Sequence, residues 1–155
     1  MSIRQYAYFA LSSQHISADE ITSRLGITPD EVSVRGGRIT TPRAIPASHR
    51  WKVVCREPDL CVDEQIARIL DRLRPHTARI AELAGQLAAG GGGAVLQVVR
   101  YFNDTDNESP RHPDAPDAPN LFGWHLDRDV LDFLAAVDAE LDVDEYDMTP
   151  GEDTV

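Results

Sequence analysis

The five histidines are the residues whose chemistry could most readily support catalysis or metal binding: His15, His49, His76, His112 and His125. No two of them are four residues apart, so no helix presents a histidine pair to one metal ion. The sequence also lacks the GxSxG, GxxxxGK[ST] and HExxH motifs, and no GxGxxG opens a helix. Ordinary hydrogen-bonded histidines are therefore the favoured interpretation. The sequence favours a non-enzymatic protein with no catalytic residue, no metal and no cofactor.

Negative charge is concentrated in the last third of the chain. Of the net charge of −11, residues 101–155 contribute 16 Asp/Glu against 2 Lys/Arg, whereas residues 1–100 hold 10 against 13. Such a surface repels nucleic acid and anionic membranes and attracts basic proteins. We therefore expect a protein-binding module, one version being an immunity protein that neutralises a basic toxin. The candidate contacts are Asp104, Asp106, Glu108, Asp142, Asp144 and Glu145. An acidic surface that only maintains solubility is the alternative.

A second charge feature is the interval between Glu31 and Glu57, which contains no acid. Its six cations could bind phosphate groups or another anionic small molecule, with His15, His49 or His125 assisting in an enzyme of that kind. They could equally pair with the acids of the same chain. The acidic overall charge argues against nucleic acid as the ligand, because domains that bind nucleic acid are usually basic. The candidate anion contacts are Arg35, Arg38, Arg43 and Arg50.

The elements that must position these residues follow from hydrophobic periodicity. Two-residue alternation predicts strands over about 5–11, 31–35, 51–56, 94–102, 121–126 and 141–146. Apolar stripes predict helices over about 18–25, 62–74, 75–87 and 127–135. Ser17 and Glu20 form a capping box for the first helix, and Gly26 supplies its end. On the strand at 51–56, Trp51 should face the core, opposite the cations.

This order predicts an α+β protein with a single sheet and helices mainly on one face. A ferredoxin-like βαββαβ core extended by a C-terminal βαβ unit fits the order, although the strand order itself stays open. Residues 1–146 should form one domain, in which 103–120 make a flexible, acidic, proline-rich loop. Residues 147–155 should form a disordered acidic tail.

The sequence predicts a cytoplasmic protein. The chain has 155 residues, enough for one domain with its own core. No apolar run is long enough to span a membrane, and the first ten residues lack the features of a signal peptide. Cys55 and Cys61 are expected to be thiols, since they do not match the usual spacings of metal or redox pairs.

Three segments together resemble a bacterial family described only as a domain of unknown function (DUF 4279). They are residues 16–31, which include the capping box; the strand around Trp51; and Phe122-Gly-Trp-His-Leu126, leading to Leu141-Asp-Val-Asp-Glu-Tyr146. The resemblance spans about residues 5–146. It implies a small α+β fold and no established activity, partner or catalytic residue.

Overall fold

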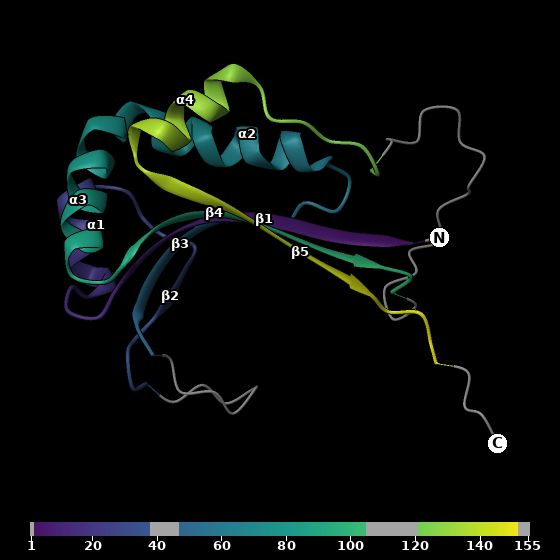
Figure 1. Ribbon diagram of the computed structural model, residues 1–155, viewed down its shortest axis with the longest axis horizontal. Helices are drawn as coiled ribbons and strands as arrows, with labels where there is room; N and C mark the ends of the chain where they lie inside the picture. The colour runs from purple at the N-terminus through teal and green to yellow at the C-terminus, as the bar shows by residue number, and fades with distance from the viewer. Residues whose placement is uncertain (1, 38–46, 105–120, 152–155) are drawn as a thin grey trace.

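The computed structural model describes residues 2–37, 47–104 and 121–151, whose helices and strands are drawn in Figure 1. The strands are β1 (Ile3–Ser13), β2 (Glu31–Ser33), β3 (His49–Cys55), β4 (Gly93–Phe102) and β5 (Ala139–Asp147). The helices are α1 (Ala18–Leu25), α2 (Val62–Leu73), the short 3₁₀ helix η1 (Arg74–His76), α3 (Thr77–Ala89) and α4 (Arg128–Ala136).

The described strands form one mixed sheet in the order β2-β3-β1-β4-β5. β1 is antiparallel to its neighbours β3 and β4, and β2 is antiparallel to β3. β5 is parallel to β4, so the chain crosses from one to the other through α4. The predicted α+β class with a single sheet is therefore confirmed.

The helix ends follow the capping signals of the sequence. Ser17 accepts a hydrogen bond from the Glu20 amide at 3.2 Å, and Gly26 ends α1 with a left-handed φ of 70°. The predicted helix over 18–25 is confirmed. Asp127 caps α4 in the same way by accepting from the Val130 amide at 2.9 Å. These side chains satisfy amides that the first turn of a helix leaves without partners.

The core lies between the sheet and the helices. On β1, Ala7, Phe9 and Leu11 are fully buried, whereas Tyr6 and Tyr8 on the other face are half-buried. Trp51 is also fully buried and donates its indole N–H to the Thr22 hydroxyl at 3.1 Å. Figure 1 shows α2 and α4 above the sheet and α1 and α3 at its left-hand end.

Residues 121–126 do not form the strand that their pattern predicts. Arg100 of β4 donates to the carbonyls of Leu121 and Phe122, each at 3.0 Å, while Trp124 packs against the core. A side chain thus satisfies backbone groups that a neighbouring strand would otherwise bond. The C-terminal βαβ unit consists instead of β4, α4 and β5.

The turn between α3 and β4 packs closely against the end of β1. A Cβ atom at Gly92 would lie only 2.0 Å from the Ser12 carbonyl oxygen. The Gly92 amide donates to the Leu87 carbonyl at 2.8 Å. The glycine run is therefore a tight junction that fixes where β4 begins.

The last strand continues slightly beyond its predicted end. The Met148 amide donates to the Phe102 carbonyl at 2.8 Å, and the Asp147 carboxylate accepts from Thr149 and Asn103. The remainder of the predicted tail, 152–155, and most of the predicted loop, 105–120, lie outside the described residues. Within the described ranges, no helix is long and apolar enough to cross a membrane.

Candidate functional site

One face of the sheet, called the open face below, is covered by no helix in the described part of the chain. It is formed by residues that the strand register brings to the same side. They are Glu31 and Ser33 on β2; Arg50, Lys52 and Val54 on β3; Arg4, Tyr6, Tyr8, Ala10 and Ser12 on β1; Val95, Gln97, Val99 and Tyr101 on β4; and Glu140, Asp142, Asp144 and Tyr146 on β5.

Four tyrosines lie on the open face. The Tyr6 and Tyr8 rings are 6.3 Å apart, and the Tyr101 and Tyr146 rings stack at 5.1 Å. The first three are partly buried, and Tyr146 is 45% exposed. Tyrosine supplies a large, rigid contact area with a polar tip, which is why it is enriched in protein interfaces.

Cations of β1 and β3 lie over these rings. The Arg4 guanidinium is 4.0 Å from the Tyr101 ring centroid, and the Lys52 ammonium is 4.3 Å from the Tyr8 ring centroid. Lys52 also lies 4.0 Å from a Glu31 carboxylate oxygen. Because both cations are already stabilised by neighbours within the chain, they hold the tyrosines in place and are poorly suited to capture an external anion.

Burial shifts the titration of three groups on this face, Tyr6, Tyr8 and Lys52, and for Tyr6 it raises the pKa. It raises the pKa of Tyr8, which the Asp142 and Asp144 carboxylates also raise and the Arg50 guanidinium opposes. Burial lowers the pKa of Lys52, which the Glu31 carboxylate opposes. At neutral pH the face therefore presents neutral tyrosines between a cationic side and an anionic side.

The anionic side is formed by β5, where Glu140, Asp142 and Asp144 alternate along the strand. Asp144 accepts from Gln97 Nε2 at 3.1 Å. None of the three is within ion-pair distance of a cation in the described residues. This part of the face thus holds carboxylates that form no ion pair with any cation in the described ranges.

A groove of about 420 Å³ runs across the open face between its cationic and anionic sides. Tyr8, Ala10 and Gln97 line it from the central strands, Arg50 from β3 and Asp142 from β5. The glycine turn at 91–93 closes one end. The groove is open and polar, so it can accept a side chain or a loop that carries hydrogen-bonding groups.

The six predicted acidic contacts do not share one surface. Asp142 and Asp144 lie on the open face, as described. Asp104 is 6% exposed and is 2.7 Å from Arg4 Nε, and Glu145 points to the opposite face, where it lies 2.9 Å from Arg100 Nη1. Asp106 and Glu108 lie outside the described residues. Glu140, which was not among the predicted contacts, lies beside Asp142 and Asp144 on the open face. Its alternation with Asp142 in the sequence could have indicated this position.

Of the predicted anion contacts that the structure describes, Arg35 and Arg50, the second belongs to the open face. The Arg35 amide donates to His49 Nδ1 at 3.1 Å, and its guanidinium reaches the Gln14 carbonyl at 3.4 Å. Arg38 and Arg43 lie outside the described residues. The described residues therefore bring one of these arginines to the groove.

A buried polar network beneath β5 was not foreseen from the sequence. Arg100 is 5% exposed and donates to Gln5 Oε1 at 3.2 Å in addition to Glu145. Gln65, fully buried, donates to the Gln5 carbonyl at 3.2 Å. The sequence does contain a signal for this network: Arg100 interrupts the most apolar strand of the chain, and a buried arginine requires polar partners. This network joins β1, β4 and β5.

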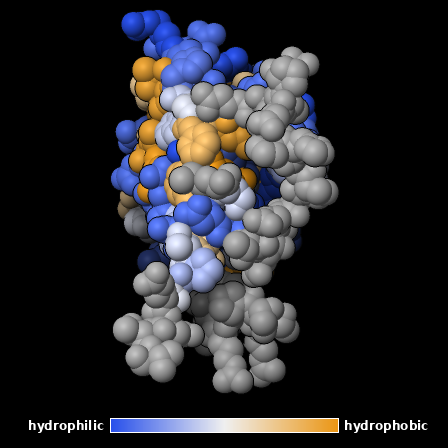
Figure 2. Space-filling view, turned by 90° about the vertical axis from the view of Figure 1, so that its right-hand side faces the viewer, coloured by the Kyte–Doolittle hydropathy of each residue, from blue (hydrophilic) through white to orange (hydrophobic). Residues whose placement is uncertain are grey.

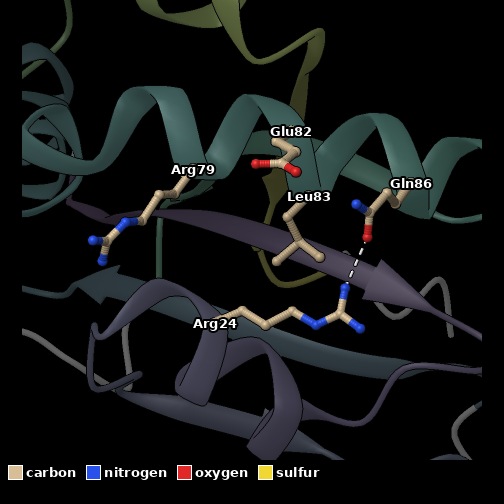
Figure 3. A pocket seen from close by; sticks show the side chains of 5 residues that line it. All are labelled: Arg24, Arg79, Glu82, Leu83 and Gln86. Atoms are coloured by element: carbon tan, nitrogen blue, oxygen red, sulfur yellow. Dashed lines mark hydrogen bonds between the residues drawn. The ribbon is translucent and has the colours of Figure 1, made fainter.

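A second hollow, between α1 and α3, is a weaker candidate (Figure 3). It has a volume of about 290 Å³ and is lined by Arg24, Arg79, Glu82, Leu83 and Gln86. Arg24 spans it, donating to Gln86 Oε1 at 2.8 Å and pairing with Glu20. Its main polar group is thus already satisfied from within the chain.

The four histidines that the structure describes do not assemble with carboxylates into a metal site. Within the described ranges, no group of three or more His, Cys, Asp or Glu residues could hold a metal ion. His125 Nδ1 lies 3.2 Å from Asp63 Oδ2 in a surface contact, and His49 accepts from the Arg35 amide. These contacts are structural, and they link neighbouring segments.

Comparison with known proteins identifies the family and nothing more specific. The model of the family described as Domain of unknown function (DUF4279) matches residues 3–148, nearly the whole chain. This match confirms the predicted resemblance. No curated protein and no solved structure matches the chain.

Proposed function

Because the chain belongs to the family described as Domain of unknown function (DUF4279), whose description assigns no activity, we propose a function from the open face. The protein is a non-enzymatic protein-binding module that holds a basic partner against β5 and the adjoining tyrosines. An immunity-like protein that neutralises a basic toxin is a concrete version of this role.

The observation that carries the proposal is the contrast among the acids of the C-terminal third. Asp104 and Glu145 are paired with arginines of the same chain, whereas Glu140 and Asp142 on the open face have no cation within ion-pair distance among the described residues. Like charges that alternate along a strand repel one another. A partner that supplies lysine or arginine side chains would relieve this repulsion.

The tyrosines provide the contact area that charges alone lack. Exposed ion pairs contribute only about 0–1 kcal/mol each, so a charged strand would give steering and little affinity. Aromatic residues account for many of the largest contributions in measured interfaces. Tyr146 follows the acidic row on β5, and Tyr8 lines the groove together with Asp142, so a partner bound to the carboxylates would cover both rings.

A small-molecule or phosphate-binding protein is the second candidate, because Arg50 and the polar groove could hold an anion. The neighbouring Asp142 argues against it, since a carboxylate in the same groove repels a phosphate group. A ligand that carries both an ammonium and an anionic group would avoid this conflict. A thermal shift with such a ligand that is lost in Arg50→Gln would favour this candidate.

We also infer a ferredoxin-like core and a cytoplasmic location. The four strands β2-β3-β1-β4, each antiparallel to its neighbours and connected as βαββαβ, support the first inference. Cys55 and Cys61 are not joined in a disulfide, which is typical of a reducing compartment and supports the second.

The test is capture of partners from the native host on the immobilised wild-type protein and on the variant Asp142→Asn/Asp144→Asn. Asp129→Asn/Asp132→Asn on α4 is the matched control, since it removes the same charge from another surface. We expect wild type and control to retain a stoichiometric basic protein at physiological salt, and the open-face variant to lose it. Because salt screens such contacts, a high-salt wash should release the partner. Equal capture by all three proteins, or retention at high salt, would contradict the proposal.

A further inference from the structure

The outer edge of β5 carries features that specify how a partner would bind. In the described residues β5 pairs only with β4, and it is a border strand of the sheet (Figure 1). A border strand exposes a row of backbone N–H and C=O groups that can bond a further strand. The register with β4 runs without a break from Ala139 to Asp147, so this edge is regular along its whole length.

The hydrogen bonds to β4 show which residues have their backbone groups at this edge. The Met148 amide donates to the Phe102 carbonyl, so even-numbered residues direct their N–H and C=O groups towards β4. The direction alternates along a strand. Leu141, Val143 and Glu145 therefore direct theirs outwards.

The side chains of β5 also alternate, and they define two different surfaces for an added strand. Glu140, Asp142 and Asp144 lie on the open face, while Leu141 and Val143 lie on the helix face. Leu141 is 40% exposed and Val143 38%, and Leu131 on α4 is 51% exposed. Figure 2, which faces the end at which β4 and β5 finish, shows hydrophobic residues next to hydrophilic ones on the surface.

We propose that β5 binds an extended segment of a partner protein in which basic and apolar residues alternate. The segment continues the sheet by one strand. Its lysine or arginine side chains lie beside Glu140, Asp142 and Asp144, and its apolar side chains lie beside Leu141 and Val143. Strand addition supplies affinity through the backbone and specificity through alternate side chains. This inference rests on the proposed function and adds the mode of binding.

Charge argues against a second copy of the same chain as the occupant. Two β5 strands paired with each other would bring two rows of carboxylates together on the open face, and like charges on neighbouring strands destabilise pairing. A basic segment removes this conflict. The same carboxylates thus protect the edge from self-association and select a cationic strand.

The test compares two peptides of identical composition and charge: Lys-Val-Lys-Val-Lys-Val-Lys, and Lys-Lys-Lys-Lys-Val-Val-Val, both blocked at their termini. Binding is measured by calorimetry, and amide exchange of β5 by NMR. We expect the alternating peptide to bind at least tenfold more tightly, as an order of magnitude, and to slow exchange of the Val143 and Glu145 amides.

Val143→Pro, which removes one outward N–H and leaves the β4 pairing intact, should weaken binding of the alternating peptide roughly fivefold. Val143→Thr, which keeps that N–H, should weaken it less.

The outcomes separate this inference from the proposed function. Equal binding of the two peptides, abolished in Asp142→Asn/Asp144→Asn, would overturn strand addition and retain the acidic binding face. Binding of neither peptide would overturn both. Amides already protected in the free protein would also overturn strand addition. Protection that grows with protein concentration would assign the edge to a second copy, and protection independent of concentration would assign it to another part of the chain.

Discussion

Arg100 is the residue that most directly ties β5 to the rest of the molecule. Its guanidinium contacts Gln5, Glu145 and the carbonyls of residues 121 and 122, although the side chain is 5% exposed. Removing it leaves the buried Gln5 Oε1 without this donor and also takes the donor from the carbonyls of residues 121 and 122. We expect Arg100→Met to lower the free energy of unfolding by about 3 kcal/mol in urea denaturation.

The control for Arg100 is Arg24→Met, which removes an exposed arginine with two partners of its own. Exposed ion pairs contribute little, so the loss should be below about 1 kcal/mol. Equal losses of unfolding free energy in the two variants would show that the buried Arg100 contacts stabilise the protein no more than exposed ones do.

Gly92 is the position at which a side chain has least room. A methyl group there would collide with the Ser12 carbonyl, so we expect Gly92→Ala to destabilise the protein by roughly 1–3 kcal/mol or more. Gly85 is the matched control, because it is exposed in α3 and a Cβ there meets no atom within 4 Å. Gly85→Ala should stabilise by about 0.5–1 kcal/mol in the same urea series. A neutral Gly92→Ala would contradict the close contact.

Tyr8 should ionise late in an alkaline titration followed by tyrosinate absorbance. Burial raises its pKa above the ordinary 10.0, so the folded state keeps the proton longer than the unfolded chain. This contribution to stability is complete below pH 10 and is lost as pH rises through the folded-state pKa. Tyr8→Phe should remove a late-titrating group. If it removed a group that titrates at the ordinary value, the burial of Tyr8 would be disproved.

The titration of Lys52 changes stability in the opposite direction to that of Tyr8 in the same alkaline pH range. Burial lowers its pKa, so its linked stability is present at pH above its unfolded value and is lost as pH falls through the folded one. Absorbance is therefore the better readout for Tyr8, because overall stability at alkaline pH combines the two effects.

At the scale of elements, sequence reasoning succeeded where the signal is local. Ser17, Glu20 and Gly26 determine α1, and the structure has the helix at the predicted residues. Residues 121–126 show the limit of such reasoning. Their alternation is typical of a strand, but Arg100, more than twenty residues earlier, takes the carbonyls. Long-range hydrogen bonds of this kind leave no mark in local periodicity.

Helix α4 leads directly into β5, so the N-terminal cap that fixes the start of α4 also helps to set the position of β5. We expect Asp127→Ala to lower the free energy of unfolding by about 1 kcal/mol, since the Val130 amide loses its acceptor. Asp129→Ala, which removes an acid in the same turn but no cap, should cost less. The reverse order in thermal denaturation would show that Asp127 is not the functional cap.

At the scale of the whole molecule, the acids of the C-terminal third divide into those paired with arginines of the same chain and those on the open face that form no ion pair in the described residues. From the sequence it could be predicted that acids gather after residue 100, but not which of them are neutralised. Asp104 and Glu145 pair with Arg4 and Arg100 across the sheet. The open face emerges only when the five strands of the described sheet, distant in sequence, bring their tyrosines, cations and carboxylates to one side.

The most direct test of a basic partner on the open face is carboxyl footprinting of the captured complex by mass spectrometry. Glu140, Asp142 and Asp144 should become protected from carbodiimide-coupled labelling when the partner is bound, while Asp129 and Asp132 on α4 stay reactive. Unchanged labelling of the three β5 carboxylates, with protection at other acids, would place the partner elsewhere and contradict the open-face binding site.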